Sequence, residues 1–412
     1  MNLSKSLLIL AAFIFTISCD TNNTNDEIAT PDSYEFTRSG QSTVSFSGQT
    51  TRIKMATELS VAMTDFDNST EELLLEMYRN ETANGGDANP YSDADLNAAI
   101  KSVKSKVAAS TDFFSTNTAT SVELKNQFET WISAQINEVF PNQNVEAQPG
   151  IAGQIADGTS TRYVSAKGFE YNQMLAKGLI GALMADQILN NYVSVSVLDA
   201  GNNVEENTAK VTLDGKAYTN MEHKWDEAYG YLFGVSQNKA KPLATIGEDD
   251  DFLNEYVGKV NSDPDFEGIA QEIFDAYALG RAAIVENDYD LRDEQATILR
   301  NRISTVLAVR AVYYLESGIN ALQETPTNYG AAFHDLSEAY GFMFSLQFSR
   351  VPNTDDSYLT KAEIDGFLAA LEEGNGLWDV QVETLQNIST SIASKFNFTI
   401  EEAANKLKEP SC

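Results

Sequence analysis

The sequence HKWDEAYGYLF at residues 223–233 returns as HDLSEAYGFMF at residues 334–344. Each copy begins with a histidine, and these two are the only histidines in the 412 residues. The shared pattern is H-x-x-x-E-A-Y-G followed by an aromatic residue, Leu or Met, and Phe. A pattern that recurs at equivalent positions predicts duplicated architecture with a repeated role.

On a helix, residues four positions apart lie on the same face. His223 therefore shares a face with Glu227, and His334 shares one with Glu338. An imidazole and a carboxylate at this spacing form half of a site for iron, zinc or another divalent metal, and helical bundles assemble such sites from facing helices. The first interpretation is a metal site at these four residues, with the metal unidentified.

A second interpretation comes from the helices predicted before each repeat, because each carries a lone cation in an apolar stretch. Lys177 lies in the stretch 174–184 and Arg310 in the stretch 303–314. A buried cation needs an anion, and Glu227 and Glu338 are the nearest candidates in sequence. The repeats are then buried charge networks, and Ala-Tyr-Gly permits close helix packing. A pocket for another small ligand is the third interpretation, and the residues leave all three open.

Apolar periodicity predicts helices along most of the chain after residue 50, so the fold class is mainly α. We expect two bundle-like halves at 34–236 and 249–412, related by duplication and joined by a polar segment that contains Pro242 and Gly247. A short hairpin or extended arm is predicted at 34–47. Alternating Val and Ser at 193–197 predicts a small β insertion near 192–215. Residues 141–166 read as a long loop.

The N-terminus has the features of a lipoprotein signal peptide over residues 1–18. Lys5 precedes an apolar run at 7–17, which is too short to span a bilayer, and Ser18 precedes Cys19. Lipidated Cys19 would attach the protein to the membrane, with 19–33 as a disordered tether. We therefore expect an outer-membrane lipoprotein of the cell envelope. The remaining cysteine, Cys412, is expected to be an incidental thiol.

Composition narrows the function further. The chain has 60 Asp and Glu residues against 28 Lys and Arg, a formal net charge of −32, which disfavours nucleic acid as a partner. The sequence has no H-E-x-x-H, G-x-S-x-G, Walker or dinucleotide motif, so we expect no enzyme. The tryptophans at 131, 225 and 378 are expected to pack in the core rather than to bind sugars. The acidic residues at 286–294 can hold a cation, although a helix cap at Asp288 or Asp290 is the simpler account.

Two parts of the chain resemble a known family. They are SYEF at 33–36 with SGQTTRIKM at 47–55, and EYNQMLAKGLIG at 170–181 with EHKWDEAYG at 222–230. They resemble Bacteroidetes envelope lipoproteins of the domain of unknown function 4856 family. That resemblance implies an envelope location and no particular activity.

The chain more distantly resembles imelysin-like proteins, which are duplicated α-helical bundles linked to iron uptake. Their motif is G-x-H-x-x-E, whereas here each glutamate lies four residues after its histidine, and Met221 and Ala332 stand where the motif has glycine. This resemblance implies that the four repeat residues bind iron, another metal or a metal-bearing ligand. The alternative is a structural or nutrient- or glycan-capture lipoprotein whose repeats only pack.

Overall fold

The computed structural model describes residues 28–404. The predicted signal peptide, Cys19, Cys412 and most of the predicted tether lie outside these residues. The fold is mainly α, as the sequence predicts. Among the described helices, none combines the length and the apolar character needed to cross a membrane.

The part of the chain up to the first repeat contains two small hairpins and a series of helices. Its elements are β1 (Thr37–Arg38), β2 (Gln41–Ser42), α1 (Ser47–Ala62), α2 (Glu71–Arg79), α3 (Ala94–Asn97), α4 (Thr111–Phe114), α5 (Thr118–Ala134), η1 (Gln135–Val139), η2 (Phe140–Asn142), β3 (Gly153–Asp157), β4 (Ser160–Val164), α6 (Tyr171–Leu179), η3 (Ile180–Ala185), η4 (Ile188–Tyr192), α7 (Val195–Leu198), α8 (Asn203–Thr208) and α9 (Asn220–Phe233).

The rest of the described chain is helical. Its elements are η5 (Pro242–Thr245), α10 (Leu253–Asn261), α11 (Ile269–Glu286), α12 (Tyr289–Leu322), α13 (Tyr329–Ser345), η6 (Leu346–Phe348), α14 (Lys361–Glu372), η7 (Gly376–Trp378), α15 (Val382–Phe396) and α16 (Ile400–Ala404). The first repeat therefore lies on α9, and the second lies on α13.

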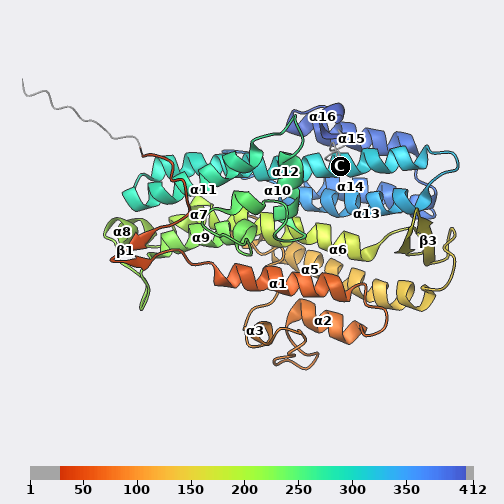
Figure 1. Ribbon diagram of the computed structural model, residues 1–412, viewed down its shortest axis with the longest axis horizontal. Coiled ribbons are helices and arrows are strands. Elements are labelled where there is room, and N and C mark those ends of the chain that lie inside the picture. Colours follow the sequence, from red (N-terminus) through yellow and green to blue (C-terminus); the bar gives the residue numbers. More distant parts are fainter. Residues whose placement is uncertain (1–27, 405–412) are drawn as a thin grey trace, which may run out of the picture.

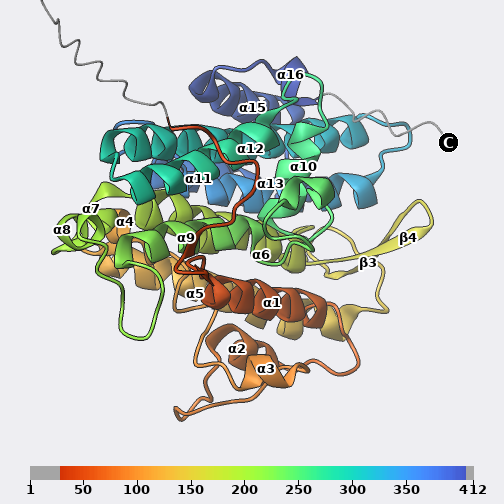
Figure 2. The ribbon, with the colours of Figure 1, turned by 60° about the vertical axis from the view of Figure 1, so that its left-hand side comes forward.

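The longest described helix, α12, organises the packing. Its 34 residues extend over roughly 50 Å, and α11, α13, α15 and α16 all pack against it. Helix α13 also packs against α6, and α9 packs against α1 (Figure 1). Figure 2 shows α2 and α3 outside α1, and the β3–β4 hairpin projecting beyond the helices. The two repeat helices therefore lie inside the bundle, with other helices on both sides.

Residues on both sides of the predicted linker belong to one continuous hydrophobic core. Leu183 and Trp225 from the first predicted half and Leu307 and Phe342 from the second are all fully buried in it. The division into two duplicated halves stays a prediction.

The short hairpin expected at 34–47 is confirmed, because β1 and β2 pair across Ser39 and Gly40, which both have positive φ. The segment 141–166 is not the loop that was expected. Within it β3 and β4 pair over five residues each and are joined at Gly158 (φ 58°). The two residues between the strands are Gly158 and Thr159, and glycine at the first of these positions is a hairpin signal that is present in the sequence itself.

The predicted β insertion near 192–215 is wrong, because this segment forms the short helices α7 and α8. The Val197 and Leu198 amides donate to the Ser194 carbonyl, which closes a helical turn in place of a strand ladder. The alternation also does not sort the valines onto one face, since Val193 is buried and Val195 is 43% exposed. An isolated pair of strands is marginal in water, and nothing in the described chain pairs with this segment.

The glycine of each repeat allows a close approach between helices. A Cβ atom at Gly341 would lie 2.6 Å from the Lys177 Cβ on α6. One at Gly230 would lie 2.4 Å from the Cβ of Phe46, at the start of α1. Both distances are shorter than carbon atoms tolerate without movement, so the glycine of the pattern is explained by packing in both copies.

We predict that Gly341→Ala lowers the free energy of unfolding by about 1–3 kcal/mol, because the added methyl forces α13 away from α6. Gly366→Ala is the matched control, since Gly366 lies within α14 and the methyl group added there would have no atom within 4 Å. The control is expected to be neutral or stabilising by up to about 1 kcal/mol through helix propensity. Chemical denaturation measures both, and equal effects would contradict the close-approach explanation.

Candidate functional site

Local capping fixes where each repeat helix begins. Thr219 and Glu222 form a capping box at the start of α9: the Glu222 amide donates to the Thr219 hydroxyl, and the Thr219 amide donates to the Glu222 carboxylate. Asn328 caps α13 by accepting from the Ala331 amide. These caps place His223 and His334 in the early turns, where both imidazoles are about three-quarters buried.

The histidine and the glutamate of the first repeat contact a backbone carbonyl, an amide side chain and a lysine of the same helix. His223 Nδ1 lies 3.0 Å from the Ser45 carbonyl oxygen, so this nitrogen carries the proton and donates. Glu227 accepts from Gln49 Nε2 at 3.0 Å and from Lys224 Nζ at 2.9 Å. Burial is the main reason that the pKa of His223 is lowered, with the Glu227 charge opposing it. His223 is therefore a neutral hydrogen-bonded imidazole at neutral pH.

The second repeat is held by charged groups. The Glu338 carboxylate lies 3.2 Å from Lys177 Nζ, and both side chains are about 8% exposed. His334 Nδ1 lies 3.2 Å from the carboxylate of Glu170. Burial alone would raise the pKa of Glu338, but the Lys177 ammonium and His334 hold it at about 2. Burial likewise works to lower the pKa of His334, and the hydrogen bond and charge of Glu170 more than offset it, so this pKa is raised.

Arg310 completes the second cluster without a carboxylate partner among the described residues. Its guanidinium carbon lies 4.0 Å from the ring centre of Tyr313 and 4.5 Å from that of Tyr314, with Tyr256 at 5.4 Å. Its Nε is buried with no hydrogen-bond partner in the described structure. The faces of these rings offer the guanidinium an electrostatic partner in place of an ion pair.

The structure changes the pairing expected from the sequence. Lys177 pairs with Glu338, and Arg310 lies in the same cluster, whereas Glu227 is paired by Lys224 of its own helix. No described contact joins the His/Glu pair of one repeat to that of the other. The two repeats are therefore two separate networks.

The buried cation of the first repeat is Arg281 on α11, which the sequence reasoning missed. It is fully buried and lies 3.0 Å from Asp226 and 3.2 Å from Glu222. Glu222 also pairs with Arg38, and Asp226 accepts from the Tyr34 hydroxyl. Arg281 stands alone in the apolar run 276–285, which is the same signal that singled out Lys177 and Arg310.

A cleft of about 450 Å³ borders the second repeat. Besides the repeat residues, mixed charges and tyrosines line it: Gln173, Asp251, Glu255, Lys259, Tyr313 and Asp335. The donor set does not fit a metal ion, because the described residues contain no group of three His, Cys, Asp or Glu side chains placed to hold one. A carboxylate already paired with an ammonium, such as Glu338, is also a poorer ligand.

These features define a mainly helical protein whose two internal repeats are buried polar networks between packed helices. The chain belongs to the family described as domain of unknown function (DUF4856), whose model matches residues 31–399. No curated protein and no solved structure matches the chain.

We predict that Glu338→Gln lowers the free energy of unfolding by about 3–5 kcal/mol, because it leaves the Lys177 ammonium buried without an anion. The Lys177→Met/Glu338→Leu pair should recover most of this loss, since no charge then stays buried. Glu227→Gln is the matched control and should cost about 1 kcal/mol or less, because its partner Lys224 is more exposed.

The pH dependence checks the same pair. Because the pKa of Glu338 is lowered to about 2 from an ordinary 4.5, its stabilisation is complete above pH 4.5 and is lost as pH falls toward 2. The difference in free energy of unfolding between the wild type and Glu338→Gln should therefore become smaller as the pH falls from 4.5 toward 2. A difference that stays constant with pH would contradict a buried Lys177–Glu338 pair. So would a Glu338→Gln variant that is no less stable than Glu227→Gln.

The two histidines are predicted to titrate in opposite directions from the ordinary pKa of 6.5. His334 has a raised pKa, so its stabilisation is present below pH 6.5 and is lost as pH rises through the folded value. His223 has a lowered pKa, so it destabilises the fold as pH falls below 6.5. NMR titration of the imidazole signals, assigned with His223→Gln and His334→Gln, measures both values, and the reverse order would refute this environment for each.

Proposed function

We propose that this protein is a lipid-anchored, non-catalytic capture protein of the bacterial cell envelope, and that its two repeats are structural networks. The observation that carries this proposal is that the charged and imidazole groups of both repeats are already engaged inside the protein. Glu338 is paired with Lys177, Glu227 with Lys224, His223 with the Ser45 carbonyl and His334 with Glu170.

The same contacts argue against catalysis by the repeats. A nucleophilic mechanism of the serine or cysteine type needs a histidine that hydrogen bonds to a hydroxyl or thiol. Within the described part of the chain, neither His223 nor His334 hydrogen bonds to a Ser, Thr or Cys side chain. Stability and helix contacts therefore explain the repeats better than a reaction does.

The anchor and the envelope location rest on the sequence around Cys19, which lies outside the described residues. Capture of a glycan on a tryptophan surface receives no support from Trp131 or Trp225, which are 2% and 0% exposed in the core. Only Trp378 is partly exposed, and it packs against Phe333 and Tyr329. Capture of a sugar by stacking on a tryptophan surface is therefore disfavoured.

Iron or another divalent metal is the second candidate ligand, and one observation favours it. His334 and Glu170 lie side by side, and Oε1 of Glu170 is buried with no hydrogen-bond partner among the described residues. Together they supply two donors, whereas stable metal sites in proteins use four or more ligands. Measuring the metal content of the purified protein distinguishes metal binding from the capture of a non-metal ligand.

We predict that protein purified without chelator holds no stoichiometric metal, and that His223→Ala/His334→Ala lowers the melting temperature without changing metal content. In a thermal-shift screen of metal ions, amino acids, peptides, sugars and phosphates, at least one non-metal class should raise the melting temperature. Bound iron that disappears in the double variant would replace the capture proposal with metal binding.

The anchor is tested separately with Cys19→Ser, which should move the protein from the membrane fraction to the soluble envelope fraction. Mass spectrometry of the wild-type N-terminus should find acyl chains on Cys19. If Cys19 is unmodified and the protein is found outside the membrane fraction, the lipid anchor is contradicted. The capture function is then tested by the thermal-shift screen alone.

A further inference from the structure

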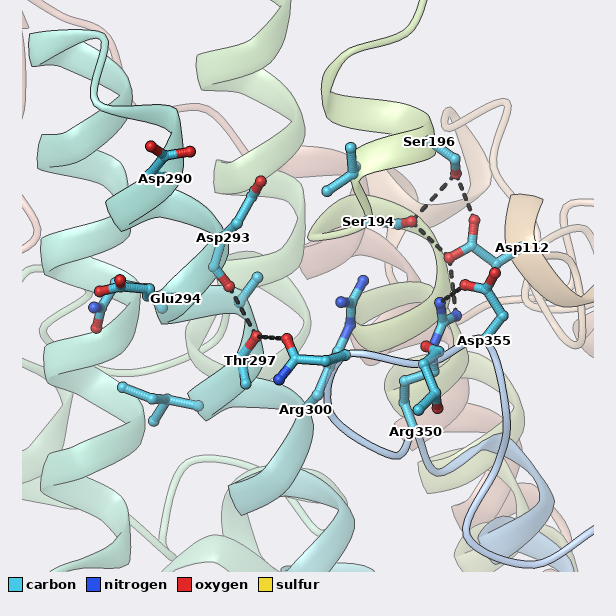
Figure 3. Close-up of a pocket in the computed structure, with 16 residues that line it drawn as sticks. Asp112, Ser194, Ser196, Asp290, Asp293, Glu294, Thr297, Arg300, Arg350 and Asp355 are labelled. Atoms are coloured by element: carbon cyan, nitrogen blue, oxygen red, sulfur yellow. Dashed lines mark hydrogen bonds and ion pairs between the residues drawn. The ribbon is translucent and has the colours of Figure 1, made fainter.

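A second cavity lies away from both repeats, between the first turns of α12, the segment 194–196 and the loop 350–355 (Figure 3). Its volume is about 1060 Å³, and none of the four repeat residues lines it. This size is at the upper end for small-molecule sites. Most of its lining side chains are polar or charged, and they include the carboxylates of Asp112, Asp290, Asp293, Glu294 and Asp355.

Two of the three buried arginines in this region are neutralised by carboxylates. Arg350 is 2% exposed and lies 2.9 Å from Asp112 and 2.5 Å from Asp355. Arg292 is 1% exposed and pairs in the same way with Asp199 and Asp293. Each of these guanidinium groups therefore meets the requirement that a buried charge has a counter-charge.

Arg300 differs from both. It is 8% exposed, its Nε donates to the Leu189 carbonyl at 3.2 Å, and no described carboxylate lies within ion-pair distance of it. Figure 3 shows its guanidinium extending into the cavity, between Asp293 and the Asp112–Arg350 pair. Burial, followed by the repulsion of Arg350, lowers the pKa of Arg300. The free N–H donors of the Arg300 guanidinium match a carboxylate in the bidentate geometry that arginine prefers.

The opposite charge lies further toward the start of the same helix. Positions 290, 293, 297 and 300 follow helical spacing along one side of α12, and Glu294 lies one turn after Asp290. Both Asp290 and Glu294 line the cavity, and neither forms an ion pair with described residues. With a rise of 1.5 Å per residue, Glu294 lies about 9 Å and Asp290 about 15 Å along the axis from Arg300. The cavity wall is thus negative toward the start of α12 and positive deeper inside.

We propose that this cavity binds a short zwitterionic peptide, with its C-terminal carboxylate on Arg300 and its N-terminal ammonium toward Glu294 and Asp290. These offsets along the helix axis are comparable to the length of about three or four extended residues. A ligand with negative charge alone is disfavoured, because five carboxylates line the cavity against two arginines. This inference rests on the proposed capture function and names its ligand class.

Isothermal titration calorimetry of the detergent-purified full chain tests the inference with trialanine as the probe. Trialanine should bind, and N-acetyl-trialanine, trialanine amide and inorganic phosphate should each bind at least about tenfold more weakly, because each lacks one of the two charged ends. Asp290→Asn/Glu294→Gln should weaken the binding of trialanine without weakening the binding of N-acetyl-trialanine, which has no ammonium group for these carboxylates to bind.

Arg300→Gln should reduce trialanine affinity by at least about tenfold. Its melting temperature should equal or exceed that of wild type, because the variant removes a buried cation that has no counter-charge. Arg302→Gln is the matched control, since Arg302 lies on the same helix, is 41% exposed and pairs with Glu272 at the surface. The control should bind trialanine as wild type does.

Trialanine that does not bind, or that binds equally well to Arg300→Gln, overturns the inference. Phosphate that binds more tightly than trialanine also overturns it and leaves an anion site. If trialanine fails while another class raises the melting temperature in the screen, the capture function stands and the peptide assignment falls. If no class in the screen raises it, both proposals fail.

Discussion

The Lys177 ammonium and the Glu338 carboxylate meet at 3.2 Å in the contact between α6 and α13, and both side chains are almost completely withdrawn from water. A pair of this kind is stable only while the surrounding atoms stay in place, because either charge alone would be costly to bury. The missing side chain at Gly341 brings the two helices close enough to seal it. Since α13 also packs along α12, this contact fixes the positions of three central helices.

The first repeat also has a close glycine contact and buried charges, but its partners are different. Its glycine lies against the start of α1, and its charges are neutralised by Arg281 and by the N-terminal arm. Tyr34 of the arm donates to Asp226 and stacks on Tyr229 with ring centres 3.6 Å apart. The arm is therefore part of the core network, which explains why a segment so short in regular structure has a well-defined place.

Much of the fold could be predicted from the sequence, and the failures have identifiable physical causes. Apolar periodicity located the helices, and the glycine-containing turn located the first hairpin. The alternating valines at 193–197 misled, because alternation predicts a strand only where a partner strand exists. The β3–β4 hairpin was missed because proline and glycine content outweighed its single turn signal. Whether the two halves are duplicated stays a prediction.

The sequence by itself determined that two H-x-x-x-E-A-Y-G helices exist, that His and Glu share a face in each, and that a lone cation in an apolar helix needs a partner. Only the tertiary structure decided which partners meet. In the folded protein Lys177 pairs with Glu338, and Arg281 is the buried cation of the first repeat. Arg300 lines a cavity and has no carboxylate partner among the described residues. The reason is that pairing depends on the angle and distance at which distant helices cross, and no local pattern encodes these.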